Sequence, residues 1–207
     1  MSFEYEQHFP YDSIRDQQTK AIDFALDSFL NSNKKFVIIE AGTGVGKSAV
    51  GLTVSRYLRN DIPSPLLAED TGVYFLTTQK ILQEQYVQDF GGYNGPMKSI
   101  KSSANYTCTF NKRTTCAESQ RALRTTERGS RFWRSCAFNC VYKKAKENFL
   151  AGDEGITNFP YFLAETQYAG KLKPRQVLVI DEAHNMASEL SKFIEITISD
   201  KFCKAFL

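Results

Sequence analysis

The octapeptide at residues 41–48 constrains the fold of this chain more than any other segment. It reads AGTGVGKS, the phosphate-binding P-loop pattern with Ala41 in place of the usual first glycine. The β-branched run FVIIE at 36–40 precedes it and predicts a strand, and helical sequence follows from Lys47 to about Arg59. A strand, a glycine-rich turn and a helix in this order begin an α/β unit. We therefore expect an α/β domain with a parallel sheet.

The residues of the P-loop predict a site for ATP and Mg²⁺. The following helix presents its positive N-terminal end to the phosphates. Lys47 is expected to reach the β- and γ-phosphates, and the Ser48 hydroxyl is expected to hold Mg²⁺. A chance glycine-rich turn is the alternative, but the position between a strand and a helix favours the nucleotide site. The backbone N–H groups that cradle phosphate oxygens belong to Ala41, Gly42, Thr43, Gly44, Val45 and Gly46.

A second motif, DEAH at 181–184, directly follows the apolar run VLVI, which predicts another strand. Asp181 is the expected partner of the Mg²⁺ held by Ser48, and Glu182 is expected to position or deprotonate the attacking water. His184 is expected to link nucleotide state to the rest of the domain. Alone, DEAH is also compatible with an exposed helix start capped by an acid. The long spacing from Lys47 to Asp181 predicts an inserted domain.

Four cysteines lie within that spacing and form the obvious insertion. Seven residues separate Cys108 from Cys116, nineteen separate Cys116 from Cys136, and three separate Cys136 from Cys140. Clustered cysteines outside an oxidising compartment bind metal more often than they form disulfides. The spacing alone suits a 4Fe–4S cluster and a zinc site about equally. Cys203 lies outside this group and reads as a buried helix residue.

Charge is concentrated in the same part of the chain. Residues 98–146 hold twelve Lys or Arg and two Glu, a net charge of +10, whereas the whole chain carries only +3. Such an excess indicates contact with nucleic acid, and a solvated charged surface is the alternative. Phe132 and Trp133 lie among the arginines and suit either base stacking or a small domain core.

The order of these motifs resembles the first motor domain of the XPD/DinG superfamily-2 iron–sulfur helicases. The order is Arg15-x-x-Gln18, the P-loop, TTQKILQEQ at 77–85, the four cysteines and DEAHN. The resemblance covers nearly the whole chain, and CVYKKAKENFLAGDEGITNFPYFL at 140–163 is especially close. It implies a RecA-like P-loop domain interrupted by a small, mainly helical iron–sulfur domain.

The resemblance also assigns residues to ligands. It implies a 4Fe–4S cluster on Cys108, Cys116, Cys136 and Cys140, and ATP-driven 5′ to 3′ translocation along single-stranded DNA. Arg15 and Gln18 would contact the adenine side, aided by Phe9 or Tyr11. Asn158 and Tyr161 are weaker DNA candidates and favour a packing role. The expected DNA contacts are Thr77, Thr78 and Gln79 on the backbone of the strand and Arg113, Arg131 and Arg134 in the basic segment.

The predicted domain organisation has three parts. Residues 1–96 and 152–193 form the motor domain, 97–151 the iron–sulfur insertion, and 194–207 the start of a truncated arch domain. The 207 residues do not include the family's second motor domain or the arginine that it is expected to supply, which would raise hydrolysis by about 10³–10⁵-fold. Three explanations stay open: a fragment, a separately encoded second half as partner, or an inactive relic.

Two further functions compete with the helicase interpretation. One is a non-catalytic nucleic-acid-binding module with a regulatory ATP site, and the other is a zinc-containing P-loop ATPase. The N-terminus lacks the apolar core of a signal peptide, and the apolar runs are too short to cross a membrane. A cytoplasmic protein, or a nuclear one in a eukaryote, is therefore expected, with no membrane partner.

Overall fold

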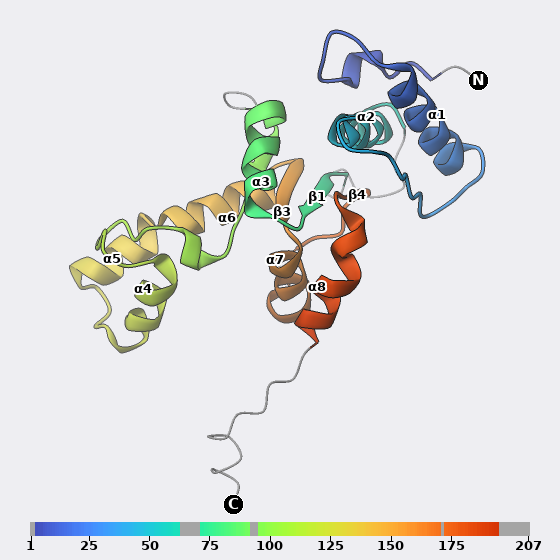
Figure 1. The fold of residues 1–207 in the computed structure, drawn as a ribbon. Helices are drawn as coiled ribbons and strands as arrows, with labels where there is room; N and C mark the ends of the chain where they lie inside the picture. Colours follow the sequence, from blue (N-terminus) through green and yellow to red (C-terminus); the bar gives the residue numbers. More distant parts are fainter. Residues whose placement is uncertain (1–2, 63–70, 92–94, 171, 195–207) are drawn as a thin grey trace, which may run out of the picture.

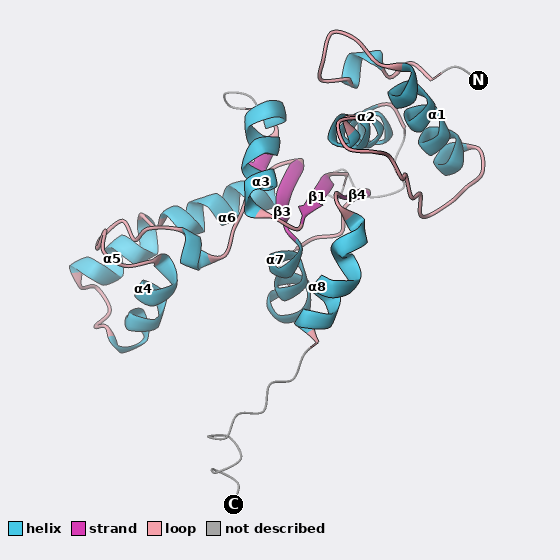
Figure 2. Ribbon diagram, viewed as in Figure 1, coloured by secondary structure: helices cyan, strands magenta, loops and turns pink. Residues whose placement is uncertain are grey.

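The computed structural model describes residues 3–62, 71–91, 95–170 and 172–194. Within them lies a parallel four-stranded sheet with the strand order β2–β3–β1–β4. Helices surround this sheet (Figures 1 and 2), so the predicted α/β fold with a parallel sheet is confirmed. The strands are β1 (Val73–Thr77), β2 (Met97–Ser99), β3 (Glu154–Asn158) and β4 (Val177–Ile180).

Eight α-helices of the described residues connect or flank the strands. The helices that pack against the sheet include α2, which contacts β4, and α7, which contacts both β1 and β3. In Figure 1, α4 and α5 form a lobe that lies away from the sheet, and α6 leads from this lobe back to it. The helices are α1 (Asp16–Leu30), α2 (Lys47–Asn60), α3 (Lys80–Tyr86), α4 (Cys116–Ala122), α5 (Arg131–Phe138), α6 (Val141–Ala151), α7 (Phe159–Ala164) and α8 (Met186–Phe193).

The central strand β1 forms because its apolar sequence is covered on both faces. All five of its residues are buried, as expected for a central strand of a parallel sheet. Val73 pairs with Glu154 of β3 on one side and with Val177 of β4 on the other. The carboxyl ends of β1 and β4 therefore lie together. Thr77, the last residue of β1, and Asp181, which follows β4, lie at the same edge of the sheet.

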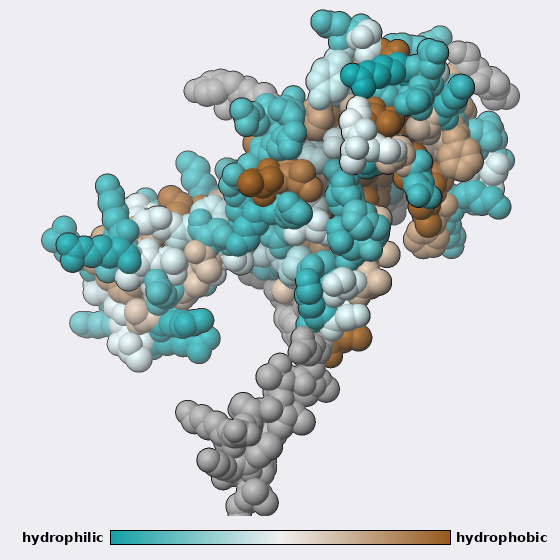
Figure 3. Space-filling model, viewed as in Figure 1, coloured by the Kyte–Doolittle hydropathy of each residue, from teal (hydrophilic) through white to brown (hydrophobic). Residues whose placement is uncertain are grey.

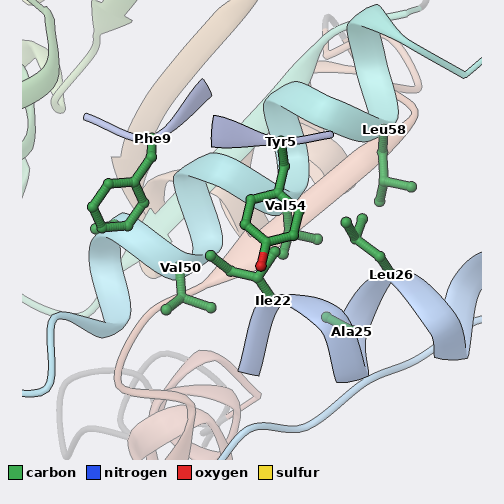
Figure 4. Packing of buried hydrophobic residues seen from close by; sticks show 9 residues of the cluster. Tyr5, Phe9, Ile22, Ala25, Leu26, Val50, Val54 and Leu58 are labelled. Atoms are coloured by element: carbon green, nitrogen blue, oxygen red, sulfur yellow. The ribbon is translucent and has the colours of Figure 1, made fainter. Parts of the chain in front are cut away.

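A separate apolar core joins α1 to α2. Figure 4 shows Ile22 and Leu26 of α1 facing Val54 and Leu58 of α2, with Tyr5 packed over them. Ile22 and Leu26 are fully buried, and each buried aliphatic side chain stabilises the fold by about 1.5–3 kcal/mol. This packing fixes the start of α1 beside the P-loop.

The predicted strand at 36–40 is wrong, because this segment forms no strand and pairs with none among the described residues. Val37 and Ile39 pack against the α1–α2 core. Phe36 and Ile38 point the other way and are 87% and 86% exposed. The alternation of buried and exposed side chains is therefore typical of a strand, but a hydrogen-bonded ladder also needs a neighbouring backbone.

The cysteine-containing segment holds two helices that the sequence patterns did not predict. Thr115 caps α4 by accepting a hydrogen bond from the N–H of Glu118, whose side chain bonds back to Thr115. Ser130 caps α5 through the N–H of Trp133. Both helices have eight residues or fewer, so neither shows a long apolar repeat.

The boundaries of the expected domains stay a prediction. The segment 97–151, expected as the iron–sulfur insertion, begins with β2, which pairs with β3 of the four-stranded sheet. Residues 195–207, expected to belong to the start of an arch domain, lie outside the described residues, and so does Cys203.

A partly buried arginine ties the end of α6 to the sheet. The Arg175 guanidinium lies 4.2 Å from the centroid of the Tyr74 ring. It donates to the carbonyl of Val73 at 2.8 Å and to those of Phe149 and Gly152. With a further bond to the carbonyl of Asp153 at 3.2 Å, Arg175 satisfies four carbonyls at once. These bonds hold the α6–β3 turn against β1 and give its buried acceptors a partner.

Candidate nucleotide site and cysteine cluster

The P-loop turns into α2 through two glycines with positive φ. Gly44 has φ 78° and Gly46 has φ 83°, a region that residues with a side chain rarely adopt. A Cβ on Gly46 would also lie 2.5 Å from Nε2 of Gln18. Gly46 is the N-cap of α2, so this conformation aims the first N–H groups of the helix into the loop.

Lys47 folds back over the loop. Its ammonium donates to the carbonyl oxygens of Ala41 at 3.2 Å and Gly42 at 3.3 Å. A lysine in this position can exchange carbonyl partners for phosphate oxygens without leaving the loop. The expected contact of Lys47 with the β- and γ-phosphates stays a prediction.

Arg15 and Gln18, at the start of α1, contact the P-loop directly. Arg15 Nη1 donates to the carbonyl of Gly44 at 3.0 Å, and Gln18 Nε2 donates to that of Val45 at 2.9 Å. Gln18 is buried, and its Oε1 accepts the N–H of Arg15. These residues therefore shape the loop through its backbone. Their contact with adenine stays a prediction.

Ser48 and Asp181 meet although they lie 133 residues apart in sequence. The Ser48 hydroxyl donates to Asp181 Oδ2 at 3.2 Å, and the N–H of Glu182 donates to Oδ1 at 2.9 Å. The same Oδ2 accepts the hydroxyl of Tyr86 at 2.9 Å. Burial, together with the Asp181 carboxylate, raises the pKa of Tyr86, so the hydroxyl keeps its proton and donates. The sequence pattern places Tyr86 only on a helix face.

Glu182 has a backbone conformation that is unusual for a residue with a side chain. Its φ is 54°, in the left-handed region, and Asn33 is the other such non-glycine residue in the described part of the chain. Strain of this kind occurs often at active sites. The Glu182 carboxylate lies 3.1 Å from Nδ1 of His184, and the His184 side chain is 70% exposed. Glu182 thus lies next to the Ser48–Asp181 pair, and its carboxylate contacts the exposed side chain of His184.

The three residues expected to contact DNA after β1 differ in exposure. Thr77 is buried and its hydroxyl donates to the carbonyl of Gln79 at 3.0 Å. Gln79 is exposed and is the N-cap of α3. Within the described residues, the buried Oγ1 of Thr78 has no partner. Gln79 offers its side chain to solvent, while a DNA contact by Thr77 stays a prediction.

Asn158 and Tyr161 both act in packing. Asn158 caps α7 by accepting the N–H of Tyr161 at 3.0 Å. Tyr161 is buried, and its hydroxyl lies 3.2 Å from that of Tyr142 on α6. These contacts join α6 to α7 and agree with the preferred packing role.

The four cysteines expected to bind metal line one cavity. Its wall also includes Ser119 and Lys143, and the Sγ atoms of Cys116 and Cys140 lie 3.9 Å apart. Burial, together with Cys140, raises the pKa of Cys116 to about 11. The structure thus brings Cys108, Cys116, Cys136 and Cys140 together across a segment of irregular sequence and short helices.

The environment of the thiols differs from one cysteine to the next. Burial raises the pKa of Cys136, and the neighbouring thiols add to the effect. Burial also acts to raise the pKa of Cys108, but hydrogen bonds from Ser119 and from the N–H of Asn111 hold it below its ordinary value. Metal ligation requires thiolates, so a metal bound here displaces protons from the buried thiols.

Four cysteine thiols are the donor set of an iron–sulfur cluster and also of a four-cysteine zinc site. Within the described residues, no three His, Cys, Asp or Glu side chains are arranged to hold a single metal ion. Four thiols around one shared cavity nevertheless supply the ligands that a cluster requires. The choice of iron over zinc stays a prediction.

The surface of the α4–α5 lobe combines cations with aromatic rings. Arg113, Arg131 and Arg134 are exposed, and no carboxylate pairs with their guanidinium groups in the described part of the chain. Hydrophilic side chains cover most of this lobe in Figure 3. The ring centroids of Phe110 and Phe132 lie 5.3 Å apart, with Phe110 half exposed.

The parallel sheet and the paired Ser48 and Asp181 are typical of a P-loop nucleotide-binding domain, and the family match that follows indicates a superfamily-2 helicase-type domain. The chain belongs to the family described as type III restriction enzyme, res subunit, whose model matches residues 12–207. A comparison with curated proteins found no match. Among the described helices, none has both the length and the apolar character that crossing a membrane requires.

Proposed function

We propose that this chain is the ATP-binding, iron–sulfur-containing N-terminal half of a DNA helicase that moves 5′ to 3′ on single strands. One observation carries the nucleotide part of the proposal. The Ser48 hydroxyl and the Asp181 carboxylate meet at 3.2 Å, beside a P-loop whose lysine faces inward. Family membership supports an ATP-dependent nucleic-acid motor.

The proposed nucleotide chemistry assigns one role to each of these side chains. Lys47 and the N–H groups at the start of α2 bind phosphate oxygens, and Ser48 and Asp181 hold Mg²⁺. Bound Mg²⁺ neutralises charge on the β- and γ-phosphates. Glu182 lies next to Asp181 and orients the attacking water or accepts its proton. Arg15 and Gln18 fix the loop and face the adenine side.

The cysteine cavity is proposed to hold a 4Fe–4S cluster. Four thiols from the segment around α4 and α5 line it, and Lys143 in its wall supplies a positive charge against the thiolates. The cluster would join segments that otherwise share little apolar core, because Cys136 is the one buried residue of α5. Its role is therefore to fix the shape of the lobe.

Single-stranded DNA is the proposed partner of this lobe. Exposed arginines bind phosphates, and exposed rings such as Phe110 and Phe138 stack on bases, which are available only in a single strand. A second motor half, on the same chain or encoded separately, is proposed to complete the ATP site.

The test compares two variants of the nucleotide site. Lys47→Ala removes the cation that faces the phosphates and is expected to weaken Mg²⁺–ATP binding by tenfold or more, about 1.4 kcal/mol. Glu182→Gln keeps the shape of the side chain but removes the base. It is expected to bind nucleotide as the wild type does and to lose the slow hydrolysis stimulated by single-stranded DNA. Fluorescent-nucleotide titration and phosphate release measure the two properties.

Two outcomes would contradict the proposal. Equal loss of nucleotide binding in both variants would reject the assigned role of Glu182. Wild-type protein that binds ATP but shows no hydrolysis at any DNA concentration would favour a non-catalytic module in which ATP is regulatory.

A further inference from the structure

Tyr86 is a buried residue whose hydroxyl group lies beside the nucleotide site. The proposed chemistry assigns no role to this hydroxyl. Tyr86 is the last residue of α3 and is 3% exposed. Its ring centroid lies 5.9 Å from that of Phe75 on β1 and 5.3 Å from that of Phe90. Packing on two sides fixes the ring, and with it the position of the hydroxyl.

The hydroxyl of Tyr86 meets the carboxylate that is expected to hold Mg²⁺. It donates to Asp181 Oδ2 at 2.9 Å, and Ser48 donates to the same oxygen at 3.2 Å. The N–H of Glu182 donates to Oδ1 at 2.9 Å. Three donors from three segments of the chain therefore set the orientation of one carboxylate.

These three donors are not equivalent once a metal is bound. Ser48 is itself an expected Mg²⁺ ligand, so its hydroxyl is then engaged by the metal. The N–H of Glu182 belongs to the residue next to Asp181 and cannot fix the strand end against another element. Tyr86 remains as the donor that connects Asp181 to the packed core of the sheet.

We propose that Tyr86 is a positioning residue of the Mg²⁺ site, whose hydroxyl holds Asp181 in its metal-binding orientation. The inference rests on the proposed function, because it takes Asp181 as a Mg²⁺ ligand. In this proposal Tyr86 is not itself a ligand of nucleotide or metal and acts through Asp181. Groups that orient metal ligands in this way typically change metal affinity by about 10–100-fold when removed.

The experiment uses Tyr86→Phe, which removes one oxygen and keeps the packed ring. Binding of a fluorescent ATP analogue is titrated with Mg²⁺, and again in EDTA. We expect the variant to need about tenfold more Mg²⁺ for half-maximal binding, with unchanged binding in EDTA. Far-ultraviolet circular dichroism and thermal melting verify that the variant is folded.

Tyr74→Phe is the matched control. Tyr74 is 5% exposed and lies on β1, and its hydroxyl donates to the carbonyl of Lys173 at 3.0 Å, remote from Asp181. It loses the same atom from an equally buried ring. Its Mg²⁺ requirement is expected to equal that of the wild type, whatever its effect on melting temperature.

A double variant makes the assignment specific. If Tyr86 acts through Asp181, adding Tyr86→Phe to Asp181→Asn changes the Mg²⁺ requirement no further. If Tyr86→Phe needs no more Mg²⁺ than the wild type and Tyr74→Phe do, the role of Tyr86 is overturned but the proposed metal site is not. Wild-type protein that binds nucleotide without any Mg²⁺ dependence would instead reject the proposed metal site.

Discussion

At the scale of single residues, Gly46 has two independent reasons to be glycine. Its φ of 83° strains any residue with a side chain, and a Cβ would lie 2.5 Å from Nε2 of Gln18. That amide holds the carbonyl of Val45 at 2.9 Å. A methyl group at Gly46 therefore displaces the side chain that shapes the P-loop.

Gly46→Ala is predicted to abolish nucleotide binding. Gly129→Ala is the control, because Gly129 has nearly the same φ of 87° but a Cβ there would meet no atom within 4 Å. Both variants carry a backbone strain of about 1–2 kcal/mol, so both lower the melting temperature. Isothermal titration with Mg²⁺–ATP should separate them, and nucleotide binding retained by Gly46→Ala would refute the steric argument.

Sequence patterns predict some site residues and miss others for a physical reason. Lys47, Ser48 and Asp181 carry roles tied to motifs, and the structure brings Ser48 to Asp181 as expected. Tyr86, which the patterns miss, acts through a contact across the fold with Asp181. Gln18, which the resemblance places on the adenine side, bonds to the P-loop backbone. A tyrosine in an amphipathic helix has no pattern that distinguishes a core ring from a hydrogen-bond donor to a carboxylate.

At the scale of elements, local patterns predict strands better than they predict pairing. The predicted run VLVI forms β4, and the run VYFLT forms β1, because all five of its residues can be buried between layers. The run at 36–40 has the same β-branched character but remains unpaired in the described structure, with Phe36 and Ile38 exposed. The local composition indicates which segments favour a strand conformation, but the pairing of a strand depends on a partner strand elsewhere in the chain.

For the lobe of α4 and α5, the sequence patterns fail in the opposite way. The two helices are present, although their sequence shows no periodic apolar repeat. Capping by Thr115 and Ser130 and the shared cavity of the cysteines define these short helices. Each helix is too short to be stable alone. The stability of the lobe is therefore expected to depend on what the four thiols bind.

The basic surface of this lobe predicts the salt dependence of DNA binding. Replacing Arg113, Arg131 and Arg134 together with Ala removes three exposed cations. Each phosphate contact on a single strand contributes about −0.7 to the slope of log affinity against log salt. The triple variant should flatten that slope by up to about 2 and weaken binding at low salt, with nucleotide binding unchanged.

Titration of labelled single-stranded and duplex DNA at several salt concentrations measures this effect. Lys20, Lys34 and Lys35 provide a control of equal charge, since they lie in or after α1, outside the basic segment. Their replacement by Ala should leave the slope nearly unchanged. Equal effects of the two triple variants would mean that the lobe is only a charged surface around the cysteines.

At the scale of the whole molecule, the nucleotide site and the cysteine cavity occupy different parts of one chain. The nucleotide site joins the start of α2 to the end of β4, and the cysteine cavity belongs to the segment between β2 and α6. The α6 helix and the Arg175 contacts attach this segment to the sheet. The order of motifs, with the cysteines between P-loop and DEAH, thus corresponds in space to a lobe attached to the sheet.

The metal content of the native protein tests this account most directly. Anaerobically purified protein should be yellow-brown, with about four irons per chain and broad visible absorption. Cys136→Ser should lose the colour and destabilise the lobe, because it removes a ligand from the cavity. Cys203→Ser, at a position outside the described residues, should keep the colour. One zinc and no iron per chain would contradict the account and favour a zinc-containing P-loop ATPase.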